Sequence, residues 1–363
     1  MSQALDAAGA PATFYSGYPR WRLRHPLPKW VQTHSFRTLV IYALLRLPEK
    51  VRPAGRTLFA WQDTAFDRWV SQHLSKHDFI HAMPGQALTT FRVARRLDIQ
   101  TVLNHATGLS RNWVAIMQAE YQRVGLQLER ATVYDDSFFA RESEEYQLAD
   151  FHCAASTLVA AQLRNTGIPS ERIWVVPYGA DPAIFFPGPG PETKYRILFA
   201  GQISLRKNLL TLLRALRLLD RPDWELICCG GISDEARPDL AQSAGRTPVH
   251  FRGAISQTQL SEEMRRASVL VLPSLEEGFG LVVPQALACG TPCIVSESVG
   301  AKDLIEVRRN GSTFAPHNVR ALADELVFWA EHRTRVSGDY SWNGPAARLL
   351  NLSAGALQPL RSQ

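Results

Sequence analysis

Residues 268–296 read SVLVLPSLEEGFGLVVPQALACGTPCIVS, and this stretch decides the fold. The apolar run 268–274 has the length of a buried strand, and residues 292–296 form a second such run. Between them, Pro284 is tolerated in the first turn of a helix and Gly290 suits the end of that helix. A strand, a loop, a helix and another strand in direct succession predict neighbouring strands of a parallel sheet.

The same alternation runs through both halves of the chain. Strands are predicted at 78–83, 101–106, 195–201 and 224–231, and helices at 87–97, 158–167, 208–219 and 256–267. In the last of these helices, Ser256 and Gln259 have the spacing of a capping box. Residues 185–194, FFPGPGPETK, hold three Pro and two Gly and cannot continue a helix or a central strand. We therefore predict an α/β protein with two doubly wound halves and a boundary near residue 190.

The start of the first half departs from this pattern. Residues 2–9 have the composition of a first helix, and residues 12–18, ATFYSGY in the sequence, have that of a second strand. Such a domain ordinarily opens with a strand and a glycine-rich turn. We therefore expect the first strand of the N-terminal domain to be missing.

The composition of the chain indicates a globular protein. The chain has 363 residues, a hydrophobic content of 45% and a formal net charge of +6, which fit a globular protein of two domains. No window of about 18 uncharged apolar residues predicts a membrane span, and the N-terminus lacks the pattern of a signal peptide. Five scattered cysteines, two of them adjacent in an apolar run at 228–229, fit a reducing compartment. We expect a cytoplasmic protein.

The loop after the strand 268–274 carries residues suited to a sugar. Ligands of open parallel sheets bind outside the carboxyl ends of the strands. Gly278 and Gly280 allow a ligand to approach the backbone closely, and the carboxylate of Glu277 can only accept hydrogen bonds, which suits hydroxyl groups. The following helix offers unpaired N–H groups to a phosphate. A tight glycine turn with solvated acids explains the same residues equally well.

A second loop makes a ligand site the better interpretation. Residues 199–208, FAGQISLRKN, follow another predicted strand, and Arg206 and Lys207 stand at the entrance to a helix. Two cations beside a helix N-terminus suit a diphosphate. A pair of solvated surface cations is the alternative for this loop alone. Two phosphate-suited loops on one sheet favour a site for a sugar nucleotide.

At this point the sequence resembles a known family. It is similar to the retaining GT-B glycosyltransferases of family 4, also called group 1, over roughly residues 78–350. The motifs that carry the resemblance, in chain order, are ADFHCAAS (149–156), LRNTGIPSERIWVVPYGADPAIF (163–185), AGQISLRKN (200–208), PSLEEGFGLVVPQALACGTPCIVS (273–296) and YSWNGPAARLL (340–350). The resemblance implies two Rossmann-like domains that face each other across a cleft. Residues 1–190 would form the acceptor-side domain, residues 191–335 the nucleotide-sugar domain, and residues 336–363 a helix that crosses back to the first domain.

The resemblance also implies roles for single residues in the second domain. Glu277 would bind hydroxyls of the donor sugar and take part in catalysis. Gly278, Phe279 and Gly280 would present backbone N–H groups to the donor. Lys207 matches the phosphate-binding lysine of the family.

In the first domain, the resemblance implies a catalytic histidine. His105, in VLNHATG, matches a residue that faces the donor sugar across the cleft. His81, in DFIHAM, matches a histidine with a structural role. Taken without the resemblance, both histidines fit a buried, hydrogen-bonded position better than a catalytic one.

Two positions depart from the family pattern within the expected site. Gln285 stands where the family has a second glutamate that binds the ribose, so we expect weaker ribose binding. Gln202 stands where many members have a phosphate-binding arginine. Arg206 could take over that contact, because its guanidinium fork can still reach a diphosphate.

The implied activity is transfer of a sugar, of the hexosyl type, from a nucleotide-diphosphate donor to an acceptor hydroxyl with anomeric retention. No cofactor besides the donor substrate and no metal is expected, since no Asp-x-Asp stands at a strand end and the acids in YDDS (134–137) suit a helix cap. Cell-surface polysaccharide or glycolipid synthesis is the expected setting. The alternatives are a degenerate, non-catalytic sugar-nucleotide-binding protein and a GT-B sugar-nucleotide epimerase.

The acceptor is expected at the first domain, as a saccharide or a lipid-linked molecule. Residues 18–37, YPRWRLRHPLPKWVQTHSFR, mix cations with tryptophan, which suits peripheral association with the inner face of an anionic membrane. An irregular loop with solvated cations and packed aromatics is the alternative. Binding to nucleic acid is not expected, because the basic residues look dispersed along the chain.

Overall fold

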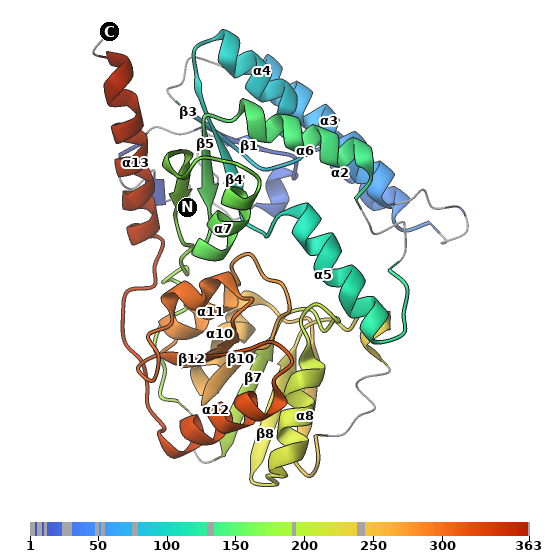
Figure 1. The fold of residues 1–363 in the computed structure, drawn as a ribbon, viewed down its shortest axis with the longest axis vertical. Helices are drawn as coiled ribbons and strands as arrows, with labels where there is room; N and C mark the ends of the chain where they lie inside the picture. The colour runs from blue at the N-terminus through green and yellow to red at the C-terminus, as the bar shows by residue number, and fades with distance from the viewer. Residues whose placement is uncertain are drawn as a thin grey trace.

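The computed structural model describes residues 4–5, 9–10, 13–23, 31–47, 51, 55–74, 79–128, 134–190, 194–237 and 244–361. Figure 1 shows two lobes, each built around its own sheet, with a long C-terminal helix that runs from the second lobe up along the first. The helix expected over residues 2–9 lies largely outside the described residues.

The main sheet of the first domain has four parallel strands. These are β3 (Phe79–Ala82), β4 (Gln100–His105), β5 (Phe151–Ala154) and β6 (Ile173–Val175), in the order β3-β4-β5-β6. The helices that alternate with them are α4 (Leu88–Arg96), α5 (Ser110–Arg123), α6 (Asp136–Leu148) and α7 (Thr157–Asn165). Asp135 caps α6 by accepting a hydrogen bond from the N–H of Phe138, as the YDDS motif predicts.

A small separate sheet precedes this one. Its strands are β1 (Phe14–Ser16) and β2 (Val31–Thr33), which pair in parallel with each other. The predicted strand at 12–18 therefore exists as β1, but it pairs with β2 and not with the four-stranded sheet. The short 3-10 helix η1 (Arg20–Arg22) and the helices α2 (Phe36–Leu44) and α3 (Gly55–Gln72) complete this part of the domain.

The second domain contains a six-stranded parallel sheet in the order β12-β11-β10-β7-β8-β9. The strands are β7 (Tyr195–Ala200), β8 (Trp224–Cys229), β9 (Val249–Gly253), β10 (Val269–Leu272), β11 (Cys293–Ser296) and β12 (Gly311–Phe314). The helices are α8 (Leu209–Leu219), α10 (Gln257–Arg266), α11 (Val282–Ala288) and α12 (Val319–Glu331). The capping box predicted for α10 is confirmed. The strand order reverses between β7 and β10, and this is the position at which doubly wound sheets bind ligands.

Shorter 3-10 helices join the larger elements: η4 (Ser170–Arg172), η5 (Asp234–Ala236) and η6 (Gly300–Leu304). All five cysteines are buried and free, which agrees with the prediction that Cys228 and Cys229 are core residues of a strand. None of the helices among the described residues has the length and apolar character needed to cross a membrane.

The C-terminal helix α13 (Asn343–Arg361) packs on the first domain. Leu349 lies in one buried cluster with Val102, Cys153 and Trp174 of the four-stranded sheet. Figure 1 shows the helix beside that sheet, away from the second domain that precedes it in the sequence. The two domains are therefore joined twice, by the residues after β6 and by the residues before α13.

Candidate active site

The switch point of the second sheet brings the two predicted loops together. We call residues 201–208 the cation loop and residues 275–281 the glutamate loop. Glu277 Oε2 accepts a hydrogen bond of 3.0 Å from Arg206 Nη1 and another from Lys207 Nζ. Arg206 Nη1 also donates to the carbonyl oxygen of Glu276 at 2.7 Å, and the N–H of Leu275 donates to the carbonyl oxygen of Arg206 at 2.8 Å. The two loops thus form one hydrogen-bonded unit.

Burial and charge oppose each other at this cluster. Burial raises the pKa of Glu277, but the nearby Lys207 and Arg206 lower it by more, so this pKa lies below its usual value. Burial lowers the pKa of Lys207, which is only 8% exposed, although Glu277 acts in the opposite direction. Glu277 is therefore a carboxylate held between two cations. Burial raises the pKa of its neighbour Glu276, partly offset by Arg206.

Three successive backbone N–H groups of the glutamate loop have no partner among the described residues. Three of its carbonyl oxygens accept hydrogen bonds: that of Glu277 from Gly300 N at 2.8 Å, that of Gly278 from Ser156 Oγ at 2.7 Å, and that of Phe279 from Ala301 N at 2.7 Å. The N–H groups of Gly278, Phe279 and Gly280 donate to no acceptor within the described part of the chain. Three free amides beside a cation pair can bind an anionic ligand.

The phenyl ring of Phe279 anchors this loop. It is 1% exposed and makes an edge contact with Tyr178, with ring centroids 5.2 Å apart. Gly280 adopts a positive φ of 98°, a conformation that favours glycine. Phe279 thus contributes to the site through its backbone, while its side chain belongs to the core.

The glutamate loop also touches the first domain, directly after β4. A Cβ on Gly278 would lie 2.3 Å from the carbonyl carbon of Thr107 and 2.4 Å from the nitrogen of Gly108, so only glycine fits there. The N–H of Gly108 donates a hydrogen bond to the Glu276 carboxylate. The loop is therefore in backbone contact with the other domain.

A second contact between the domains lies at the start of α7. The N–H and Oγ1 of Thr157 each donate to the carboxylate of Asp303, at 2.6 Å. No motif in the sequence predicts roles for the residues at these contacts, which are Ser156, Thr157, Asp303, Gly108 and Glu276. A signal for Ser156 was present, since it ends the motif ADFHCAAS.

His105 is buried inside the first domain. Its Nε2 lies 3.0 Å from Nδ1 of His152, and its ring meets the edge of Tyr146. Burial, and next the neighbouring His152, lower the pKa of His105 well below its usual value. These contacts all lie within the first domain, and the imidazole is 2% exposed. The residues that follow β4 contact the glutamate loop through Thr107, and the catalytic role of His105 stays a prediction.

The two departures from the family pattern lie at the edge of the cluster. Gln285 is half-buried on α11, and its side chain forms no hydrogen bond with another described residue. Gln202 is exposed in the cation loop. Arg206 is the arginine that reaches Glu277, and its replacement of the missing phosphate contact stays a prediction.

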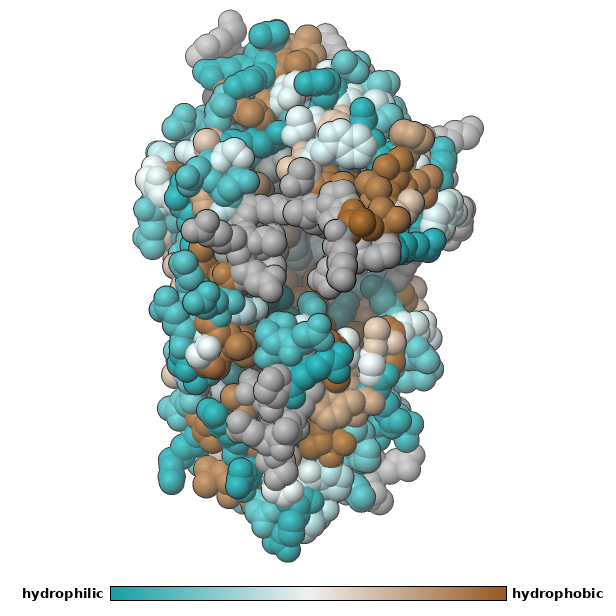
Figure 2. All heavy atoms as spheres, turned by 90° about the vertical axis from the view of Figure 1, so that its right-hand side faces the viewer, coloured by the Kyte–Doolittle hydropathy of each residue, from teal (hydrophilic) through white to brown (hydrophobic). Residues whose placement is uncertain are grey.

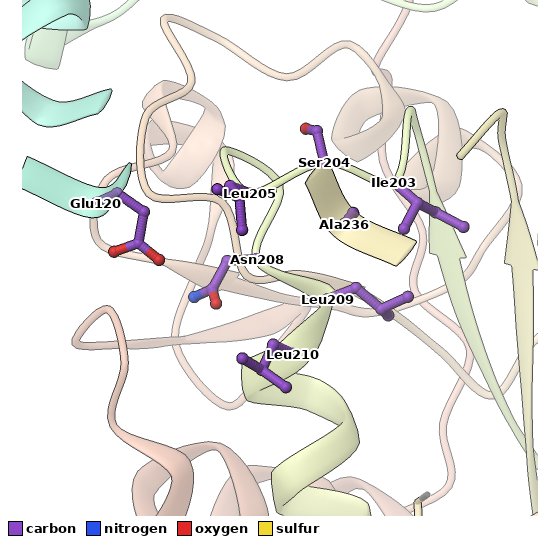
Figure 3. A pocket seen from close by; sticks show the side chains of 8 residues that line it. All are labelled: Glu120, Ile203, Ser204, Leu205, Asn208, Leu209, Leu210 and Ala236. Carbon is purple, nitrogen blue, oxygen red and sulfur yellow. The ribbon is translucent and has the colours of Figure 1, made fainter. Parts of the chain in front are cut away.

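A small pocket lies behind the cation loop. Its lining residues are Glu120, Ile203, Ser204, Leu205, Asn208, Leu209, Leu210 and Ala236, and Figure 3 shows Glu120 of α5 beside Leu205 and Asn208. Its volume of about 10 Å³ suits a single water. Glu120 accepts from Arg123 and lies 3.4 Å from His317 Nε2 of the second domain. This pocket marks a contact between the domains and is too small for a nucleotide.

A larger cavity of about 640 Å³ lies between the domain connections. Its lining residues are Pro177, Tyr178, Pro284, Leu304, Asp339, Tyr340, Ser341, Gly344, Pro345, Arg348, Asn351 and Leu352. They do not include Arg206, Lys207 or Glu277. The larger cavity is therefore not at the predicted donor site. The paired charges and free amides at the switch point are better suited to a charged ligand than the lining of this cavity.

Among the described residues, no group of three His, Cys, Asp or Glu side chains is placed to hold a metal ion. The acids of the site, Glu276 and Glu277, are instead paired with Arg206 and Lys207.

Comparison with known proteins shows a family likeness in the second half of the chain. Residues 181–337 match the family model described as glycosyl transferases group 1. This segment is similar to the group 1 glycosyl transferases. The matched residues include the whole cluster around Glu277, with the cation and glutamate loops.

Curated relatives agree with this assignment. The chain is 34% identical over 176 residues to an uncharacterized glycosyltransferase of Methanocaldococcus jannaschii, covering 45% of each chain. It is 30% identical over 248 residues to a D-inositol 3-phosphate glycosyltransferase of Xylanimonas cellulosilytica, covering 59% of each. The match spans about half the length of the first of these relatives.

Solved structures extend the likeness to the whole fold. A sucrose-phosphate synthase from Thermosynechococcus elongatus superposes with a TM-score of 0.67 at 22% identity, over 98% of this chain and 91% of that one. Anabaena HepE, solved in complex with UDP, gives a TM-score of 0.63 at 15% identity, over 97% and 100%. Together with the two parallel sheets, these neighbours show that the chain has the predicted GT-B fold.

Proposed function

We propose that the protein is a retaining, metal-independent glycosyltransferase that uses a nucleoside diphosphate sugar as donor. The observation that carries this proposal is Glu277, whose carboxylate is held by Arg206 and Lys207 beside three free amides at the switch point. The match of residues 181–337 to the group 1 glycosyl transferases supports the reaction class. The complex of HepE with UDP supports a nucleoside diphosphate donor.

The two cations suit the leaving group. In the reaction, the bond between C1 of the sugar and the β-phosphate oxygen breaks, and a bond from C1 to the acceptor oxygen forms on the same face. The acceptor hydroxyl passes its proton to the departing diphosphate oxygen, which keeps the electron pair of the broken bond. Arg206 and Lys207 stabilise that charge with preorganised donors. Glu277, released from part of its ion pairing, accepts hydrogen bonds from the sugar hydroxyls.

The domains must move for this reaction. Gly278 touches the backbone of Thr107 and Gly108, so a sugar can enter between these residues only when the contact opens. Closure over the donor then excludes water and limits hydrolysis. His105 lies two residues before Thr107 on β4, and we propose that it turns toward the sugar in the donor-bound state.

The proposal also covers where in the cell the reaction takes place and what its acceptor is. We place the reaction at the cytoplasmic face of the membrane, with a saccharide or lipid-linked acceptor, in the synthesis of a cell-surface polysaccharide or glycolipid. Arg206, which replaces the arginine expected at Gln202, is proposed to bind the diphosphate.

The test is incubation of the purified full chain with a panel of nucleoside diphosphate sugars, with and without sugar and lipid-linked acceptors, in buffer with and without EDTA. We expect release of nucleoside diphosphate that depends on the acceptor, persists in EDTA and yields a product of retained anomeric configuration by NMR. Glu277→Gln should abolish release, and Glu306→Gln, at an exposed position, should not.

Other outcomes would favour the alternatives. Conversion of the donor into an epimer without acceptor would indicate an epimerase. Tight nucleotide binding with no turnover on any acceptor would support the non-catalytic protein, for which Gln285 is the favouring observation.

A further inference from the structure

The net positive charge of the protein comes from a segment near its N-terminus. Residues 7–48 contain six Lys and Arg and no Asp or Glu. The rest of the chain therefore holds 34 residues of each sign, and the net charge of +6 equals the charge of this segment. Basic residues occur throughout the chain, and what distinguishes this segment is that it has no acidic residues to balance them.

Helix α2, within this segment, exposes an apolar face. Phe36 is 72% exposed and Leu39 is 43% exposed, and Leu47, just beyond the helix end, is 41% exposed. With the exposed Ala43, these residues follow the 3- and 4-residue spacing of one side of a helix. The opposite side is buried through Ile41, which is 1% exposed. The helix is therefore apolar on the side that faces solvent as well as on the side that packs.

Aromatic and cationic side chains join this face to its neighbours. The guanidinium of Arg22 lies 5.2 Å from the ring of Trp21, in η1, and 5.3 Å from the ring of Tyr42, in α2. The guanidinium of Arg37 lies 5.4 Å from the ring of Trp61, in α3. Trp21 is 63% exposed. The elements η1, α2 and α3 are thus linked through these cation–aromatic contacts.

We call this surface the N-terminal patch. Its members are Arg20, Trp21, Arg22, Phe36, Arg37, Leu39, Arg46, Leu47 and Trp61. Figure 2 shows hydrophobic side chains gathered on the upper lobe, which is the first domain, and a mainly hydrophilic surface over much of the remaining face. A soluble surface rarely exposes large aromatic and aliphatic side chains together in this way without a partner.

We infer that the N-terminal patch docks onto an anionic lipid bilayer. Tryptophan, phenylalanine and leucine on one side of a helix enter the boundary between headgroups and acyl chains. Arginines around them bind anionic headgroups, and residues 7–48 themselves contribute no acidic side chain to oppose that attraction. The charge of the patch therefore complements the surface it would meet.

The inference deepens the proposed function, because it names the surface that would hold the first domain, the acceptor side, at the membrane. It does not require turnover, and the patch includes none of the residues around Glu277. Its failure is therefore distinguishable from failure of the proposed reaction.

The test is flotation of the purified full chain with vesicles of phosphatidylcholine alone and of phosphatidylcholine mixed with phosphatidylglycerol. We expect flotation only with the anionic vesicles, and its loss in high salt. Trp21→Ser and Phe36→Ser should each weaken binding. The double change Arg20→Gln and Arg22→Gln should weaken it by about tenfold or more, since each cation near the surface contributes roughly fivefold.

Matched controls lie on the second domain. Val307 is 64% exposed and Arg309 is 82% exposed, so Val307→Ser and Arg309→Gln should float like the wild type. Circular dichroism and UDP binding of each variant check that it is folded. Absence of flotation, equal flotation with neutral vesicles, or equal losses in patch and control variants would overturn the inference. So would tighter binding to single-stranded DNA than to the anionic vesicles at the same salt concentration.

Discussion

Ser156 Oγ donates a 2.7 Å hydrogen bond to the carbonyl oxygen of Gly278, across the boundary between the two domains. Ser156 Oγ also accepts a hydrogen bond from the N–H of Val159 and thereby caps α7. Ser156 is fully buried. One hydroxyl thus connects the first turn of a helix in one domain to the glutamate loop of the other.

Ser156→Ala should lower the free energy of unfolding by about 2–4 kcal/mol. The change removes a helix cap, worth about 1 kcal/mol, and leaves a buried carbonyl without its donor, which costs about 1–3 kcal/mol. Denaturant titration of the full chain measures the loss. Ser71→Ala, at a half-buried helical position whose hydroxyl makes a solvent-exposed hydrogen bond, should change stability by less than about 0.5 kcal/mol. Equal effects of the two changes would show that the contact carries no stability.

Gly278→Ala should separate the glutamate loop from the first domain. The added Cβ would lie 2.3 Å from the backbone of Thr107, and backbone atoms cannot yield as a flexible side chain can. Amide hydrogen exchange of the segment around Thr107 and Gly108 should become faster by about tenfold or more. Gly231→Ala provides the control, because a Cβ there meets no atom within 4 Å. Unchanged exchange in Gly278→Ala would mean that the domains do not touch here in solution.

Asp63 predicts a pH dependence of stability. Burial raises its pKa to about 6, despite the hydrogen bond from Gln86 Nε2. The pKa of an aspartate in the unfolded chain is about 4, so the folded protein binds the Asp63 proton more tightly than the unfolded chain does. Protonation of Asp63 therefore stabilises the fold. This stabilisation grows as the pH falls through 6 and is complete below about 4. Asp63→Asn is permanently neutral. It should be more stable than the wild type near neutral pH by up to about 3 kcal/mol.

Denaturant titrations of both proteins from neutral pH down to about pH 4 check this. The advantage of Asp63→Asn should shrink steadily across that range. A variant that is less stable than the wild type at every pH would show that the carboxylate itself is the favoured form.

Gln285→Glu should strengthen nucleoside diphosphate binding. A carboxylate accepts hydrogen bonds from ribose hydroxyls with charge assistance that the amide lacks, and Gln285 has no side-chain partner among the described residues to lose. We expect about tenfold tighter binding, which corresponds to about 1.4 kcal/mol. Titration calorimetry with UDP measures it. Weaker binding by the glutamate variant would argue that Gln285 does not face the ribose.

The sequence predicts the second domain better than the first, for a physical reason. Buried parallel strands such as β7 and β10 are continuous apolar runs, and their loops carry glycine and charge in recognisable order. β1 and β2 have three residues each, too few for periodicity to assign a partner, so the pairing of β1 came only from the structure.

Within the site, the proximity of Arg206, Lys207 and Glu277 follows from strand ends meeting at one edge of a sheet, and the structure agrees. The contacts of Gly278 with Thr107 and of Thr157 with Asp303 depend on how the domains face each other. No local pattern encodes that arrangement. The burial of His105 against His152 likewise needs two strands to be paired in register before it can be seen.

We propose that Lys207, Arg206 and Glu277 form a donor site for a nucleoside diphosphate sugar. Titration calorimetry of UDP, ADP and GDP into the wild type, Lys207→Met and Lys194→Met tests for this site. We predict binding of at least one nucleotide by the wild type and by Lys194→Met, whose lysine is exposed. Lys207→Met should bind at least about tenfold more weakly, because a charged hydrogen bond to phosphate contributes about 1.5–3 kcal/mol. Equal affinity of all three proteins, or no binding of any nucleotide, would contradict the account.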